Sequence, residues 1–122
     1  MLYTSYFAKL KILTHEGITP VAICGKSPEW YNGFEYKKLA PKWGFFSEWK
    51  KNHDNHFYVR CFNEQVLDKL DINGVITDLN ELTHWSKDIA LLCYERPEDF
   101  CHRHLVANWL RENGLQVKEF GT

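Results

Sequence analysis

The sequence predicts a single α/β domain with a small, mostly parallel sheet flanked by helices. The 122 residues are enough for one domain with a substantial core and too few for two. Two apolar runs, VAIC at 21–24 and IALLC at 89–93, are continuous, which is typical of strands buried on both faces. Helical patterns stand between and after these runs, and this alternation defines the class.

The first half of the chain contains two expected strands. Residues 2–6 are β-rich and too short for an interior helix, and residues 21–24 end at a glycine. The segment SPE at 27–29 predicts the start of a brief helix, with serine as the cap and proline at the first helical position. Apolar residues three or four apart within 40–52 and 54–70 predict two amphipathic helices, although FYVRCF also fits a short strand.

The second half continues the alternation. Apolar spacing through 75–82 predicts a short helix, and 89–93 is the clearest strand. Pro97 to Asp99 favour the start of the next helix, and Asn113 with Gly114 favour its end. LQVKEF at 115–120 predicts a last strand in which Glu119 takes an inward position, where an apolar residue would be usual.

Charge and aromatic residues are unevenly distributed. The net charge is −1, so the chain lacks the basic bias of a general nucleic-acid binder. Residues 1–60 carry nine basic and five acidic residues, and 61–122 carry six and eleven. Eleven of the 33 residues from Trp30 to Phe62 are aromatic. These rings fit a core filled by large side chains, and they also fit a stacking surface for a base or sugar.

The cysteines and the hydropathy indicate a cytoplasmic protein. Cys24, Cys61, Cys93 and Cys101 show no CxxC spacing and follow no signal peptide, so we expect four reduced thiols. No apolar run approaches the roughly twenty residues that a membrane span requires.

The candidate site lies at the two strand ends, because parallel sheets bind ligands beyond the carboxyl ends of their strands. Residues 24–27 follow one strand and 93–96 follow the other. Glu95 stands where an apolar strand becomes a polar loop. Partial burial would raise its pKa and make it a usable acid or base. The alternative is a structural carboxylate that pairs with Arg96 or Arg103.

Cys101, His102 and Arg103 begin the helix that follows. A helix start attracts anions and lowers thiol pKa values, and Arg103 suits a bidentate grip on phosphate or carboxylate. Neighbours on a helix point about 100° apart, so the three do not all face one ligand. Alternatively Cys101 packs in the core, His102 is solvated and Arg103 anchors Glu95. Cys93, Cys101, His102 and His104 match no zinc spacing, and no metal is predicted.

The other strand end offers a weaker signal. Lys26 and Ser27 would meet a phosphate at a helix start, and Trp30, Tyr31 and Tyr94 would complete a pocket. The chain contains no GxxxxGK[ST], GxGxxG or GxSxG motif, which argues against a triphosphate loop, a dinucleotide fingerprint and a serine-hydrolase elbow.

The segments LLCYE and FCHRHLVANWL, with KKLAPKW and GKSPEWYNG, resemble the bacterial, archaeal and phage proteins of domain of unknown function 488 over nearly the whole chain. The resemblance implies a compact fold of flavodoxin-like or related Rossmann type. It implies no established activity, and Tyr94 and Arg96 fall outside its motif. The motif residues that it implies are Cys93, Glu95, Cys101, His102 and Arg103.

These observations lead to three hypotheses. The first is an enzyme-like domain, a hydrolase or transferase, that binds a small anionic or nucleotide-like ligand through Glu95 and Arg103, with Cys101 and His102 beside them. The second is a non-catalytic module that uses the basic, aromatic first half to bind single-stranded nucleic acid or a protein. The third is a structural Glu95–Arg103 pair. Cofactor, oligomeric state and the occurrence of catalysis stay open.

Overall fold

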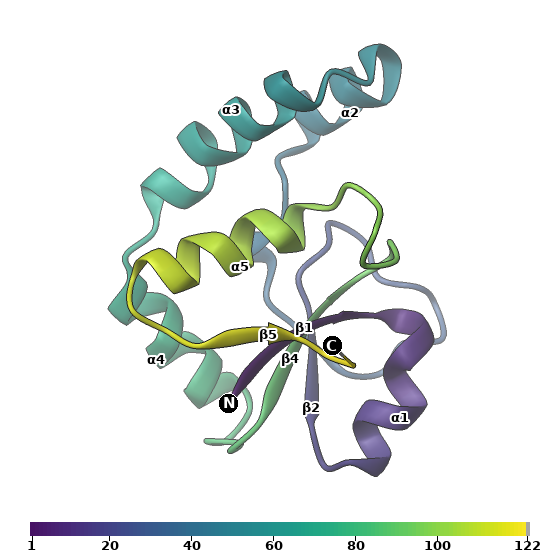
Figure 1. Ribbon diagram of the computed structural model, residues 1–122, viewed down its shortest axis with the longest axis vertical. Helices are drawn as coiled ribbons and strands as arrows, with labels where there is room; N and C mark the ends of the chain where they lie inside the picture. The colour runs from purple at the N-terminus through teal and green to yellow at the C-terminus, as the bar shows by residue number, and fades with distance from the viewer. Residues whose placement is uncertain (122) are drawn as a thin grey trace.

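The computed structural model describes residues 1–121 and contains one sheet of parallel strands (Figure 1). The strands lie in the order β3-β2-β4-β1-β5, and every neighbouring pair is parallel. This confirms the predicted α/β layer fold of flavodoxin-like or related Rossmann type. The strands are β1 (Leu2–Tyr6), β2 (Thr19–Ala22), β3 (Phe34–Glu35), β4 (Ile89–Cys93) and β5 (Val117–Glu119).

Helices cover both faces of the sheet. The α-helices are α1 (Leu10–His15), α2 (Trp43–Asn52), α3 (Asn55–Gln65), α4 (Ile72–Leu82) and α5 (His102–Glu112). Short 3₁₀ turns are η1 (Phe7–Lys9), η2 (Lys37–Leu39) and η3 (Leu67–Lys69). Among these described residues no helix is both long and apolar enough to cross a membrane.

The core is divided by the sheet because successive strand residues point to opposite faces. Ala90 and Leu92 of β4 share one apolar cluster with Leu13 of α1. Ile89 and Leu91 share the other cluster with residues from α2 to α5. All five residues of β4 are buried, as predicted for a central parallel strand.

The connections that leave the neighbouring strands β1 and β4 run in opposite directions across the sheet. From β1 the chain passes through α1 to β2, and from β4 it passes through α5 to β5. The helices lie on opposite faces, and the two connections run toward opposite edges of the sheet. The sheet therefore changes winding direction between these two neighbouring strands.

Three expectations about local structure need correction. The brief helix expected at Ser27 is absent, and a turn closes instead, with Tyr31 N–H donating to the Pro28 carbonyl at 3.0 Å. The Tyr31 ring then lies against Gly33 so closely that a Cβ there would overlap it. Helix α5 begins at His102, later than Pro97 to Asp99 suggested, because Cys101 is extended (φ −156°, ψ 142°). The short elements α1 and β3 were not expected.

Candidate functional site

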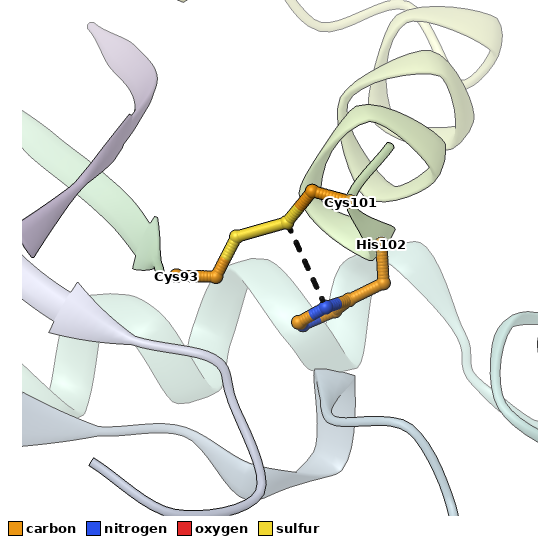
Figure 2. A group of neighbouring side chains, drawn as sticks. All are labelled: Cys93, Cys101 and His102. Atoms are coloured by element: carbon orange, nitrogen blue, oxygen red, sulfur yellow. Dashed lines mark hydrogen bonds between the residues drawn. A yellow bond between two sulfur atoms is a disulfide. The ribbon is translucent and has the colours of Figure 1, made fainter. Parts of the chain in front are cut away.

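The end of β4 and the start of α5 meet through two cysteines. Cys93 is the last residue of β4, Cys101 is the N-cap of α5, and the two form a disulfide. Figure 2 shows the bond beside the ring of His102. The expectation of four reduced thiols is therefore wrong for this pair, whereas Cys24 and Cys61 are free.

Arg103 is the most deeply buried charged residue of the site, with no exposed surface. Its Nε and Nη2 donate to the two carboxylate oxygens of Glu119 on β5, at 3.2 and 3.0 Å. Its Nη1 donates to the Glu95 backbone carbonyl at 2.6 Å and lies 3.1 Å from the Cys93 sulfur. The guanidinium carbon lies 5.6 Å from the centroid of the Tyr6 ring. One side chain thus connects the ends of β1, β4 and β5.

Glu95 is exposed, and it contacts Arg103 through its backbone. The expectations of a partly buried Glu95 side chain and of a Glu95–Arg103 carboxylate pair are therefore wrong. The carboxylate that pairs with Arg103 belongs to Glu119, which also accepts a hydrogen bond from Thr4 Oγ1 at 2.7 Å. The Glu95 carboxylate therefore faces solvent, while the buried Arg103 side chain holds the Glu95 backbone carbonyl.

His102 is buried, and one backbone group fixes its tautomer. Its Nε2 lies 2.7 Å from the carbonyl oxygen of Ile23. Because a carbonyl oxygen only accepts, Nε2 carries the proton and Nδ1 keeps a lone pair. Nδ1 faces the Cys101 sulfur at 4.0 Å. Burial lowers the pKa of His102 to about 4, so the ring is neutral at pH 7, and the idea of a solvated His102 is wrong.

The loop after β2 carries the residues predicted to bind a ligand. Lys26 is exposed, and its carbonyl accepts a hydrogen bond from the Tyr94 hydroxyl at 2.5 Å, which joins the loops after β2 and β4. Ser27 Oγ lies 2.6 Å from a carboxylate oxygen of Glu35. Tyr31 is buried, and its hydroxyl donates to the Phe34 carbonyl at 2.7 Å. Burial raises the pKa of the Tyr31 phenol.

Phe7, just after β1, packs against three aromatic rings at the carboxyl ends of the strands. Its ring centroid lies 5.0 Å from that of Tyr94, 5.3 Å from Tyr31 and 6.1 Å from Trp30. Trp30 and Tyr94 are 60% and 50% exposed. The three strand ends of β1, β2 and β4 thus present a partly solvent-facing aromatic cluster, which we call the Phe7 cluster (Phe7, Trp30, Tyr31 and Tyr94).

Sequence reasoning missed Tyr6, Phe7 and Glu119. The inward position of Glu119 in the last strand was the available signal, since a buried carboxylate requires a partner. Two surface hollows lie away from the strand ends. One of about 440 Å³ runs between α3, η3 and α5, and one of about 140 Å³ includes Met1 and Ile89 at the opposite end of the sheet.

Residues 8–114 match the family model described as the active DUF488-N3 subclade. No curated protein and no solved structure matches the chain. The matched span contains the ends of β2 and β4 with Cys93, Glu95, Cys101, His102 and Arg103, whereas Glu119 lies beyond it. The chain therefore belongs to the family of domain of unknown function 488, within its active N3 subclade.

Proposed function

We propose that this domain binds a small anionic or nucleotide-like ligand at the carboxyl ends of β1, β2 and β4, and that Glu95 performs hydrolase or transferase chemistry on it. One observation carries the proposal. The fully buried Arg103 donates a hydrogen bond to the Glu95 backbone carbonyl at 2.6 Å. The backbone that carries the exposed Glu95 carboxylate is therefore held in place by a buried side chain. Binding and catalytic residues are often carried by loops that a rigid scaffold positions in this way.

The position in the fold supports the same site. Open α/β sheets bind ligands beyond the carboxyl ends of their strands, where the winding direction changes. In this sheet the change falls between β1 and β4. Glu95 follows β4 directly, and Phe7 follows β1.

The Phe7 cluster supplies a recognition surface. Exposed Trp30 and Tyr94 offer ring faces on which a base or sugar stacks, and exposed Lys26 beside them attracts an anion. Tyr31 and Ser27 hold this loop from within through the hydrogen bonds described above. The description of the subclade as active agrees with chemistry at this edge, although it specifies no reaction.

In this proposal the motif residues have different tasks. Glu95 acts on the ligand as acid, base or nucleophile. Arg103 is a positioning residue, because its donors are engaged with Glu119, Cys93 and the Glu95 carbonyl. Cys101 and His102 belong to the same site, and their side chains are buried in the protein interior. A cytoplasmic location stays a prediction.

A thermal-shift screen against nucleotides, nucleosides and sugar phosphates tests the proposal. We expect one ligand to raise the wild-type Tm. Trp30→Ala should weaken its binding by roughly 1–3 kcal/mol, the usual value of one stacked base. Trp85→Ala is the matched control, because Trp85 is 70% exposed but lies just before β4, at the opposite end of the sheet.

Turnover of that ligand, followed by chromatography of the products, tests Glu95. Loss of a general acid or base usually costs about 10²–10⁴-fold, so we expect Glu95→Gln to bind the ligand and to lose at least two orders of magnitude in rate. The proposal fails if no small ligand shifts the Tm, or if Trp30→Ala and Trp85→Ala behave alike.

A second candidate, binding of single-stranded nucleic acid, is favoured by the surface of α2. Trp43 is 73% exposed, and exposed Lys42, Lys50 and Lys51 lie on or next to the same helix. Fewer basic side chains are available to a ligand here than the basic first half of the sequence suggested. Lys38 pairs with Asp78 at 3.1 Å, and Lys37 Nζ donates to the Gly25 carbonyl at 2.6 Å. Trp49 is half-buried, and its ring packs 5.6 Å from Phe100.

Fluorescence anisotropy with a labelled oligothymidine over a salt series tests this candidate. If α2 binds the phosphates, Lys50→Gln/Lys51→Gln should flatten the slope of log Kd against log salt by about 1.4, since each single-strand phosphate contact contributes about 0.7. Lys69→Gln/Lys118→Gln removes the same charge from exposed sites elsewhere and should leave the slope unchanged. Equal slopes in both variants would exclude this surface.

A further inference from the structure

Three ligand atoms suited to a soft metal ion converge where the end of β4 meets the start of α5. The sulfurs of Cys93 and Cys101 and Nδ1 of His102 all lie within 4.8 Å of one another. The three residues are buried, with exposed fractions of 1%, 4% and 5%. Figure 2 shows Cys93 reaching them from the end of β4, while Cys101 and His102 come from the start of α5.

The histidine is already in the form that a metal ion requires. Its Nε2–H donates to the Ile23 carbonyl at 2.7 Å, which leaves the lone pair on Nδ1, the atom facing Cys101. Metal-bound histidines characteristically donate their other N–H to a carbonyl or carboxylate in this way.

The backbone spacing of the cysteines leaves room between the sulfurs. Their Cα atoms are 7.6 Å apart, whereas disulfides usually have separations of about 4.4–6.8 Å. Two sulfurs on one tetrahedral zinc ion, each about 2.3 Å from it, lie roughly 3.8 Å apart. The wide Cα separation therefore gives the two sulfurs room to move apart to that distance once the bond between them is reduced.

We propose that reduction of the Cys93–Cys101 disulfide creates a binding site for a thiophilic divalent ion, Zn²⁺ above all, with Cys93 Sγ, Cys101 Sγ and His102 Nδ1 as ligands. A dithiol reductant supplies two electrons and two protons to the disulfide and leaves as its own disulfide. The metal ion then displaces the two thiol protons. Thiolate and imidazole together select zinc over magnesium or calcium, and three protein ligands leave a fourth position for an exogenous ligand.

The surroundings balance the charge of such a site. Two thiolates neutralise the divalent ion, and the Arg103 charge beside them is already balanced by Glu119 at 3.0 Å. Arg103 Nη1, 3.1 Å from the Cys93 sulfur, donates a hydrogen bond to the bound thiolate. Such outer contacts usually strengthen metal binding by 10- to 100-fold.

Cobalt titration of the full-length protein tests the proposal, because Co²⁺ bound to thiolates absorbs strongly in the near ultraviolet. We expect fully reduced, metal-free wild type to bind one Co²⁺ with this charge-transfer band, and Zn²⁺ to displace it. Protein oxidised to the Cys93–Cys101 disulfide should give no band. This comparison uses a single sequence, and circular dichroism of the reduced and oxidised protein checks that both keep the fold.

Variants identify the ligands. Cys93→Ser, Cys101→Ser and His102→Gln should each weaken binding at least 100-fold or remove the thiolate band, with circular dichroism checking the fold. Cys61→Ser and Cys24→Ser change the two free, buried cysteines and should bind as the wild type does. The proposal is overturned if reduced wild type binds no cobalt or if Cys93→Ser keeps the band. It is also overturned if oxidised protein binds equally well.

Discussion

Replacing Arg103 by methionine is expected to lower the free energy of unfolding by about 3–5 kcal/mol, the usual cost of removing one member of a buried ion pair. Arg103 has no exposed surface and contacts both carboxylate oxygens of Glu119. The change also removes the donor to the Glu95 carbonyl. Urea unfolding followed by circular dichroism measures the effect.

A double-mutant cycle separates the pair from simple loss of packing. Arg103→Met combined with Glu119→Leu should cost clearly less than the sum of the two single changes, because neither charge is then left buried alone. Glu95→Ala is the control, and we expect a change within about 0.5 kcal/mol because its side chain is exposed. Strictly additive single effects, or an Arg103→Met cost below about 1 kcal/mol, would contradict the assignment of Arg103 as the structural centre of the site.

Phe62→Ala is expected to cost about 3–5 kcal/mol, the typical loss for a buried phenylalanine whose cavity does not collapse. Phe62 of α3 has no exposed surface. Its ring stacks on Tyr58 with centroids 6.1 Å apart and lies 5.6 Å from the ring of His102. Urea unfolding measures the loss, and cobalt titration of the reduced variant reports whether His102 has shifted.

Trp43→Ala is the matched control for Phe62→Ala. Trp43 is 73% exposed, so removal of its larger ring should change stability by no more than about 0.5 kcal/mol. A nearly neutral effect of Phe62→Ala would contradict the close packing of α3 against the start of α5 that is described here.

The central layer of the fold was predictable because its signals are local. The five apolar residues of β4 specify a strand buried on both faces. The three- and four-residue apolar spacings of α2, α3 and α4 specify amphipathic helices. Alternation of these elements then leads to a parallel sheet.

The missed elements are short, and tertiary contacts decide them. β3 has two residues and α1 has six, too few for a periodic signal. Ser27 and Pro28 carry a sequence pattern for a helix start, yet the chain turns because Tyr31 packs under Phe7 and onto Gly33. Propensity is a weak guide when a large ring has a buried position to fill.

The candidate site is a prediction from local sequence signals, but the pairings of its residues were not predictable. Position at a strand end indicated Glu95, and a helix start indicated residues 101–103. The partner of Arg103 is Glu119, on a strand that lies beside β1 and far along the chain from the motif. Likewise, residue spacing predicts no metal, because the approach of Cys93 to Cys101 and His102 arises only when α5 packs on the sheet.

The most direct test of a ligand site at the strand ends is the amide ¹H–¹⁵N NMR spectrum of labelled protein titrated with the ligand that gives the largest thermal shift. If the ligand binds at the strand ends, the perturbed signals should cluster in residues 24–31 and 93–103, with Phe7, and those of α2 should stay unchanged. Perturbations confined to Trp43–Asn52, or spread over the molecule with none near Glu95, would contradict a ligand site at the strand ends.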